Sequence, residues 1–371
     1  MKATCQRDKL LHAFQMAASV APSRSPKPIL QNVKLEVTPD GAILMGTDLE
    51  IGIRVAVEGF AAEVPGNVVL PRDRFGKILT ESSDEQLSLE SDGGKVFVRG
   101  QRSEFQLPSE NPDEFPSVLA FEEQKYHEMP ARFLREVIRR TVFATDNESS
   151  RYALGGVLVE FSDKGLTAVA TDGRRLARQE GAAESVGEHI SGDNMTIIPT
   201  RAMQLIERAL GDSEESVQVA ARSNDVLVRS GRATIYTRLV EGRYPKWRDV
   251  FPRRDDMHRI ELCVGPFYAA VRQAAIVTSE DRRGVDFTFG GGKIVLAGHG
   301  AELGESHVEM PIAYDGPEVG IALDPRFLSD FLKVLAPEQT FSMELRDAES
   351  AAVCNTEDGY AYVVMPLARE Q

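Results

Sequence analysis

The sequence lacks any apolar run near the ~20 residues that a membrane-spanning helix requires. Residues 1–11 carry four charged side chains and no long apolar segment, which argues against a secretory signal. We therefore expect a soluble, cytoplasmic protein with no membrane partner.

Cysteine is scarce, and histidine shows no metal-binding pattern. Cys5, Cys263 and Cys354 lie far apart and form no Cys-x-x-Cys pair, so a disulfide framework or a zinc ribbon is excluded. The six histidines include no His-x-x-x-His or His-Glu-x-x-His spacing. No Ser/His/Asp or Cys/His grouping stands out either. We predict no metal, no cofactor and no catalytic residues.

The chain is long and has the composition of a globular protein. It has 371 residues, of which 42% are hydrophobic and 27% charged. Single hydrophobic cores stop growing at about 250–300 residues, so at least two domains are expected.

A repeat of about 124 residues (the spacing of matching positions) divides the chain into three. Each repeat begins with an amphipathic helix and has a second helix after its first strands. The first helices are predicted over 7–20, 130–143 and 266–277, and the second over 72–81, 200–210 and 326–335. Pro130 and Pro266 stand where a first-turn proline suits a helix start. The predicted domains are 1–122, 128–252 and 254–371, in an α+β fold.

Each repeat also contains strands joined by tight turns, at residues 39–41, 163–165 and 290–292. Gly290–Lys293 resembles part of a phosphate loop, but its glycines join two strand-like runs, so we predict a hairpin turn. Asp172 and Gly173 predict another hairpin, and Gly298–Gly300 a turn.

The positive charge is concentrated in the predicted helices. The net formal charge is −14 for the chain and +9 over 7–20, 72–79, 131–140, 201–210, 266–277 and 325–336, so the remainder carries −23. Lys and Arg favour helices in any protein, but Glu favours them equally and only two glutamates lie in these segments. The pattern favours a polyanion contacted by helices alone.

Four sequence segments resemble those of a known family: Thr171–Ala177, Glu241–Pro245, Tyr362–Leu367 and Arg151–Leu154. They resemble the motifs of the bacterial sliding clamp, the beta subunit of DNA polymerase III. The resemblance implies a DNA clamp fold of three similar domains, each with two helices packed on antiparallel sheets, in a head-to-tail dimer ring. It implies a processivity factor and not an enzyme. The implied partners are double-stranded DNA bound without sequence preference, the replicative DNA polymerase, the clamp loader, other replication and repair proteins, and a second copy of the chain.

The resemblance also implies three sets of site residues. A hydrophobic pocket for partner peptides would be formed by Leu154, Thr171, Gly173, Arg174, Arg175, Leu176, Pro245, Val250, Phe327, Val363, Val364, Met365, Pro366 and Leu367. DNA would be contacted by Arg24, Arg151, Tyr152 and Arg201. At the dimer interface, Phe105 and Leu107 of one subunit would face Ile276 and Val277 of the other.

Two alternatives remain open from the residues. One is a scaffold of three peptide-binding domains without a DNA role, which leaves the basic helices unexplained. The other is a hydrolase using paired carboxylates, which the lack of a catalytic constellation disfavours.

Overall fold

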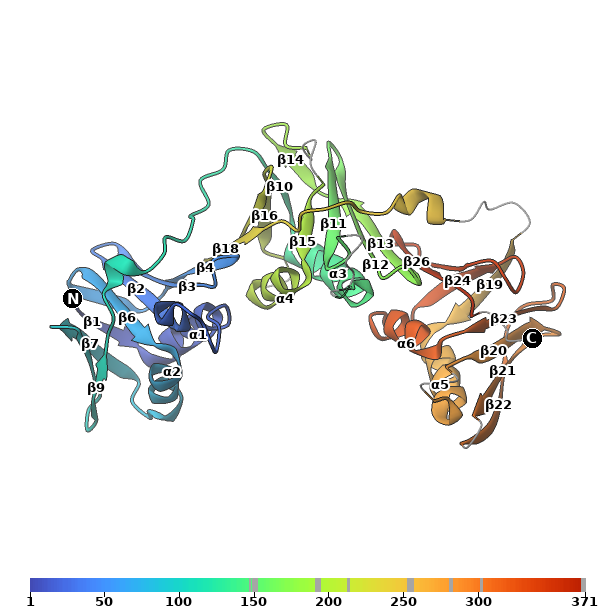
Figure 1. Cartoon of the computed structure of the whole chain (residues 1–371), viewed down its shortest axis with the longest axis horizontal. Helices are drawn as coiled ribbons and strands as arrows, with labels where there is room; N and C mark the ends of the chain where they lie inside the picture. The colour runs from blue at the N-terminus through green and yellow to red at the C-terminus, as the bar shows by residue number, and fades with distance from the viewer. Residues whose placement is uncertain are drawn as a thin grey trace. The chain divides into compact units, whose positions relative to one another are not determined.

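The computed structural model describes residues 1–146, 148, 153–190, 195–211, 214–251, 257–279, 283–300 and 303–367 (Figure 1). The chain forms two compact units. The first comprises Met1–Arg135, Ser162–Lys164 and Ala183–Leu239, and the second comprises Glu136–Phe161, Gly165–Ala182 and Val240–Gln371.

The predicted helices are confirmed. The α-helices in the described residues are α1 (Arg7–Ala18), α2 (Arg72–Glu81), α3 (Ala131–Thr141), α4 (Thr200–Ala209), α5 (Val264–Ala274) and α6 (Pro325–Lys333). Short 3-10 helices are η1 (Pro28–Gln31), η2 (Pro112–Glu114), η3 (Val142–Ala144), η4 (Trp247–Val250) and η5 (Ala275–Val277). The predicted helices over 130–143 and 266–277 thus end in the tighter turns η3 and η5. In the part of the chain that is described, no helix is both long and apolar enough to span a membrane.

The first unit contains two antiparallel sheets. A five-stranded sheet has the order β5 (Phe60–Val64), β1 (Lys2–Gln6), β7 (Gln86–Asp92), β8 (Lys95–Arg99) and β9 (Glu104–Pro108). A nine-stranded sheet has the order β14 (Glu184–Val186), β10 (Tyr126–Pro130), β16 (Ser216–Ala221), β17 (Asp225–Ser230), β18 (Ala233–Arg238), β4 (Ile51–Val57), β3 (Gly41–Thr47), β2 (Asn32–Thr38) and β6 (Gly66–Pro71). The β18–β4 pair joins strands of the first and second repeats. The short β15 (Ile197–Pro199) precedes α4.

The second unit is built in the same way. One run of antiparallel strands has the order β11 (Gly156–Ser162), β12 (Gly165–Thr171), β13 (Arg175–Ala182), β26 (Tyr360–Val364), β25 (Ala352–Asn355), β24 (Thr340–Leu345) and β19 (His258–Cys263). A four-stranded sheet has the order β22 (Gly304–Pro311), β21 (Lys293–Gly300), β20 (Val285–Gly290) and β23 (Val319–Leu323). The β13–β26 pair joins strands of the second and third repeats.

Apolar periodicity explains these elements. Val33, Leu35 and Val37 alternate on β2 and are all buried, as expected for a strand with one covered face. Phe75 and Leu79 lie one turn apart on α2 and are buried. Phe75 meets Phe14 of α1 edge to face, with ring centroids 5.0 Å apart, so the two helices pack side by side.

The α5–α6 pair has an aromatic core. Phe331 of α6 lies between Phe341 and Tyr362, at ring-centroid distances of 5.3 and 5.1 Å. Asp324 caps α6: its Oδ1 accepts a hydrogen bond from the Arg326 amide at 2.9 Å, and Pro325 occupies the first helical position. The cap fixes where α6 begins.

The glycine hairpin is confirmed, whereas the turn at Gly298–Gly300 is wrong. Gly291 and Gly292 have φ of 59° and 75° between the paired residues Gly290 and Lys293, as a tight hairpin turn requires. Gly298–Gly300 instead lies within β21, paired with β22. A Cβ on Gly298 would lie 2.7 Å from the Ala274 carbonyl oxygen, so glycine is needed there because α5 ends against the strand.

The two proline signals mark the helix starts inexactly. Pro130 is the last residue of β10, where it pairs with Ser216, and α3 begins one residue later. Pro266 is the third residue of α5 and not its first. Both prolines still stand where a missing amide leaves no helical hydrogen bond unmade.

Not all helical positive charge faces solvent. Arg140 of α3 has only 7% of its side chain exposed, and it donates to Gln179 Oε1 at 2.9 Å and to Asp358 Oδ2 at 2.8 Å. Arg135 donates to the carbonyl of Leu210 at the end of α4. These two arginines have structural partners, so the helical charge count overstates the charge available to a polyanion.

Candidate functional site

Two of the segments predicted to form the pocket, Thr171–Ala177 and Tyr362–Leu367, are brought together by the pairing of β13 with β26. Arg175 pairs with Val364 and Leu176 with Val363 in this antiparallel ladder. Beyond the ladder, the Met365 amide donates to the Arg174 carbonyl at 2.9 Å. Met365 therefore lies beside the hairpin, because the ladder carries the end of β26 directly past it. The Leu367 amide then bonds to the Ala322 carbonyl at 2.8 Å, which directs the chain toward β23.

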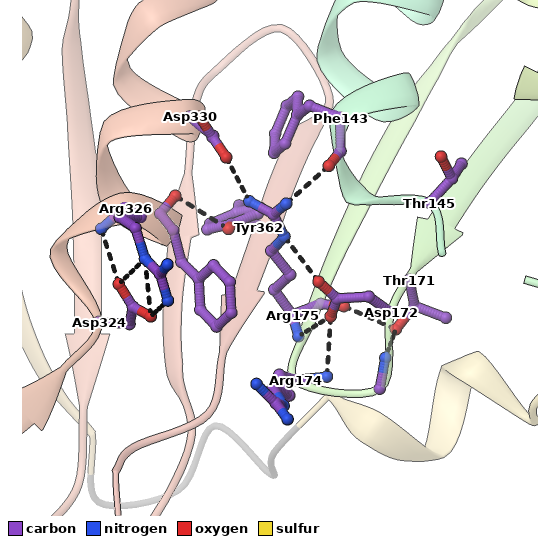
Figure 2. A network of polar contacts seen from close by, with 12 residues as sticks. Phe143, Thr145, Thr171, Asp172, Arg174, Arg175, Asp324, Arg326, Asp330 and Tyr362 are labelled. Atoms are coloured by element: carbon purple, nitrogen blue, oxygen red, sulfur yellow. Dashed lines mark hydrogen bonds and ion pairs between the residues drawn. The ribbon is translucent and has the colours of Figure 1, made fainter. Parts of the chain in front are cut away.

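The hairpin between β12 and β13 is held by its own side chains (Figure 2). Thr171 Oγ1 donates to the Arg175 carbonyl at 2.6 Å and accepts from the Gly173 amide at 3.1 Å. Asp172 Oδ1 accepts from the amides of Arg174 and Arg175 at 2.9 and 3.0 Å. Gly173 has φ of 87°, which glycine adopts without strain. The sequence Thr-Asp-Gly therefore makes a rigid turn that presents Arg174 to solvent.

Arg175 lies inside the site and not on its rim. Only 10% of its side chain is exposed. Its Nε donates to Asp172 Oδ2 at 3.0 Å, its Nη1 to Asp330 Oδ2 at 2.7 Å and its Nη2 to the Phe143 carbonyl at 2.7 Å (Figure 2). The guanidinium also lies over the rings of Phe327 and Phe143, at 4.6 and 5.2 Å from their centroids. The Arg175 side chain thereby connects the hairpin to η3 and to α6.

The wall on the α6 side is fixed by polar contacts. Tyr362 Oη donates to the Phe327 carbonyl at 3.0 Å, which ties β26 to the start of α6 (Figure 2). Asp324 and Arg326 form a two-pronged ion pair, with Nη2 at 2.7 Å from Oδ2. Phe327 directly follows Arg326 in the sequence and is half-buried. Burial raises the pKa of the Tyr362 hydroxyl, so it stays a hydrogen-bond donor.

A third segment carries Pro245 and Val250. Tyr244 is buried and its Oη donates to the Val169 carbonyl on β12 at 3.0 Å, which anchors the segment two residues before Thr171. Trp247, the only tryptophan of the chain, is buried in η4. Val250 follows it and is exposed. Pro245 therefore lies directly after an anchor on the strand that leads into the hairpin.

The predicted pocket residues differ in accessibility. Buried beneath the surface are Leu154, Thr171, Leu176, Val363 and Val364. Exposed or half-buried are Gly173, Arg174, Arg175, Pro245, Val250, Phe327, Met365, Pro366 and Leu367. The second set supplies apolar surface with one exposed cation, Arg174, whereas the first supports it from below.

Sequence reasoning missed four residues of this network: Phe143, Asp172, Asp330 and Tyr362. Asp172 lies in the Thr171–Ala177 segment, and an aspartate at the start of a tight turn is a recognisable capping residue. Asp330 is 155 positions from Arg175 in the chain, and no local signal links them.

The predicted DNA-contacting residues fall in different settings. Arg24 is exposed in the loop after α1. Arg201, in the first turn of α4, has 53% of its side chain exposed but forms an ion pair with Asp48 and donates to the Val20 carbonyl at 3.1 Å. Arg151 and Tyr152 lie outside the described residues.

The predicted interface residues also differ. Phe105 on β9 is 39% exposed and Ile276 in η5 is 75% exposed, whereas Leu107 is buried against its own sheet and Val277 is half-buried. A cavity of about 570 Å³ lies beside Phe105 and is also lined by Ile78 of α2. Phe105 and Ile276 are thus apolar side chains left in solvent by the isolated chain.

The described residues offer little for metal or thiol chemistry. They contain no group of three or more His, Cys, Asp or Glu side chains able to hold a metal ion. Burial raises the pKa of Cys5 to about 12 and also raises that of Cys354, which keeps both thiols protonated.

Comparisons with known proteins identify the fold along the whole chain. Residues 1–119, 128–246 and 248–368 match the N-terminal, central and C-terminal domains of the DNA polymerase III beta subunit. The beta sliding clamp of Pseudomonas putida is 30% identical over 99% of this chain and 100% of its own, and that of Escherichia coli K12 is 28% identical over 99% and 100%.

Solved structures agree. The DNA polymerase sliding clamp of Bacillus subtilis has a TM-score of 0.93 at 25% identity, and a Pseudomonas aeruginosa sliding clamp bound to griselimycin has 0.92 at 28%. Both comparisons cover 100% of each chain. The architecture is that of DNA clamps, three domains of helices packed on antiparallel sheets. The chain belongs to the DNA polymerase III beta subunit family, the bacterial sliding clamps.

Proposed function

We propose that two copies of this chain form a closed ring around duplex DNA and tether the replicative DNA polymerase to it. The observation that carries the proposal is the separation of charge. The observed α-helices carry a net formal charge of +8, or +6 without Arg135 and Arg140, and the rest of the −14 chain carries −22. This distribution is expected of a protein that meets a polyanion mainly through its helices.

The DNA contacts would be electrostatic and independent of sequence. Arg24 and Arg201 present guanidinium groups that suit phosphate oxygens, and phosphate contacts carry no base information. Such contacts hold the duplex while leaving it free to move along its axis. The predicted contacts from Arg151 and Tyr152 belong to the same proposal.

The ring would close through strand edges. β9 and β22 each stand at the edge of their sheet, and an unpaired antiparallel edge is a template for another strand. The exposed Ile276 of one subunit would reach the cavity beside Phe105 of the other, with Leu107 and Val277 supporting the contact. Head-to-tail closure then gives two identical interfaces.

The surface around Arg174 and Met365 would receive a peptide from the polymerase. This surface combines exposed or half-buried apolar groups with one exposed cation. A short peptide with apolar anchors and an acidic group therefore fits it. The clamp loader and other replication and repair proteins would compete for the same surface. In this role the protein binds DNA and proteins in the cytoplasm, and it does not catalyse a reaction.

Loading onto circular DNA tests the function. A clamp stays on a nicked DNA circle after loading and leaves when the circle is cut, because its link to DNA is topological. Linearisation is expected to release the protein within minutes in a gel-filtration assay at moderate salt. Equal retention on linear and circular DNA would contradict the ring and favour simple electrostatic binding.

A further inference from the structure

The Arg175 guanidinium is held mainly by contacts within the protein. Each of its three nitrogens has a protein acceptor at 2.7–3.0 Å, and the guanidinium lies over the rings of Phe143 and Phe327. Because only 10% of its side chain is exposed, the Arg175 guanidinium could reach a peptide only by breaking these contacts. An arginine that makes a hydrogen bond through each of its three nitrogens acts as a rigid connector.

The acceptors come from different parts of the site. Asp172 is on the same hairpin, three positions away, and Phe143 belongs to η3. Asp330 is the acceptor on α6, the helix whose first turn carries Phe327. The Arg175–Asp330 contact is therefore the ion pair that spans from the hairpin to the α6 wall.

We propose that Asp330 is a positioning residue of the peptide site, acting through Arg175. The pair fixes the spacing between the Arg174 hairpin and Phe327, and that spacing sets peptide affinity. Neither the Asp330 carboxylate nor the Arg175 guanidinium binds the peptide. This inference rests on the proposed peptide-binding function and adds to it that Arg174, and not Arg175, binds the peptide's acidic group.

The neighbouring side chains make a matched set of variants. Asp330 Oδ1 lies 3.6 Å from Lys333 Nζ, whereas the Arg175 contact is made through the other carboxylate oxygen, Oδ2. Lys333→Gln therefore removes a charge beside Asp330 without altering the pair. Arg174→Ala removes the exposed cation and leaves the pair intact.

The test measures binding of a dye-labelled peptide that copies the C-terminal tail of the same organism's replicative polymerase. Asp330→Asn is expected to weaken binding about tenfold, the effect of losing one charge-assisted hydrogen bond. Lys333→Gln is expected to stay within about twofold, because surface ion pairs contribute little. Thermal unfolding of each variant checks that the fold is kept.

Salt dependence separates positioning from direct contact. Arg174→Ala is expected to flatten the fall of affinity with rising salt, because it removes the charge that meets the peptide. Asp330→Asn is expected to lower affinity by the same factor at every salt concentration. The double variant with Asp330→Asn and Arg175→Met should lose no more peptide affinity than Arg175→Met alone, because both changes remove the same Arg175–Asp330 contact.

Three results would overturn the inference: full peptide affinity in Asp330→Asn, additive losses in the double variant, or a flattened salt dependence in Asp330→Asn. Should Asp330→Asn not fold, Arg175→Lys serves, because lysine keeps the charge but cannot reach three acceptors at once. Full affinity in Arg175→Lys would equally refute the positioning role. Absence of peptide binding to the unaltered protein would instead refute the proposed function.

Discussion

Leu49 and Gly173 occupy the same position in two hairpins that share one hydrogen-bond pattern. In the first, Thr47 Oγ1 donates to the Ile51 carbonyl at 2.8 Å and accepts from the Leu49 amide at 3.0 Å. The amides of Glu50 and Ile51 donate to Asp48 Oδ1, just as those of Arg174 and Arg175 donate to Asp172 Oδ1.

Leu49 and Gly173 differ in the conformational energy that the turn costs them. Leu49 has φ of 81° and Gly173 has φ of 87°, a region that side chains with a Cβ disfavour. Leu49 is also 42% exposed. The first hairpin therefore holds a strained, solvent-facing leucine where the second uses glycine, and its fold is fixed by the Thr and Asp side chains and not by the residue at the turn.

Gly173→Ala is expected to destabilise the protein by about 1 kcal/mol, the cost of a left-handed backbone for alanine. The loss should be no larger, because a Cβ at this position meets nothing within 4 Å. Urea unfolding measures it. Leu49→Gly is the matched control and should leave stability level or raise it, since it removes strain. A loss above about 3 kcal/mol in Gly173→Ala would show a packing role instead.

Arg24→Glu and Arg201→Gln are expected to weaken DNA association, most strongly at low salt. Glutamine is chosen at Arg201 because glutamate would face Asp48 and disturb the fold as well as DNA binding. Fluorescence anisotropy with duplex DNA over a salt series measures the change. Unchanged affinity in both variants would show that neither residue contacts DNA.

Asp48→Asn separates the two roles of Arg201. This change removes the ion pair but keeps the arginine, so DNA affinity should be maintained or rise while stability falls slightly. A loss of DNA affinity equal to that of Arg201→Gln would indicate that Asp48 positions the arginine.

Ile276→Asp is expected to convert the dimer into folded monomers. Burying this side chain contributes about 1.5–3 kcal/mol per interface, and a buried aspartate would cost more. Ile276 is 75% exposed in the isolated chain, so the change should not unfold it. Ile276→Asp with Val277→Asp should do the same but carries a folding risk, because Val277 Cγ2 packs near Gly298. Light scattering at micromolar concentration decides, and a persistent dimer would contradict the interface.

Deleting residues 365–371 is expected to abolish peptide binding while the dimer persists and the melting temperature falls only slightly. β26 ends at Val364, so the deletion leaves its ladders with β13 and β25 complete. Quenching or shift of Trp247 fluorescence can report binding, because η4 carries this single tryptophan beside Val250. Undiminished peptide affinity would place the pocket elsewhere.

Lowering the pH from 7.5 to 5.5 is expected to destabilise the first unit through a buried histidine pair. His127 Nδ1 lies 2.7 Å from His189 Nδ1, and His127 Nε2 lies 2.7 Å from the Ser162 carbonyl. The Ala221 amide donates to His189 Nε2 at 3.1 Å. All of these contacts are satisfied when both rings are neutral, with His189 donating through Nδ1 and His127 through Nε2.

Burial lowers the pKa of both rings, while charged neighbours act in both directions: Asp163 and Glu123 raise a ring's pKa, and Lys125 lowers one. Since the unfolded rings titrate near their ordinary value of about 6.5, the unfolded state binds more protons as the pH falls through that value. Stability is therefore lost toward acid. Urea unfolding of His189→Gln should show a weaker pH dependence than the unaltered protein, whereas the exposed His12→Gln should not. Equal dependence in both variants would contradict the assignment.

The helices and the tight turns were predictable from the sequence. Apolar spacing predicted all six helices, including both ends of α2, and turn residues predicted the hairpins at Gly290–Lys293 and Thr171–Arg175. These features are local, because the φ values and side-chain caps that define them lie within a few residues. The resemblance supplied which phrases belong to one site.

The partners of individual charges were decided only by the tertiary structure. Arg140, counted among the basic residues of a helix, is buried against Asp358, and Arg201 is paired with Asp48. Gly298–Gly300 has the composition of a turn, yet it continues β21 because α5 ends against it. Arg175 meets Asp330 across 155 positions of sequence because β13 pairs with β26 and brings α6 beside the hairpin. Local sequence determines which backbone shape each segment prefers, but the partner of a charged side chain is chosen by whichever segment packs beside it.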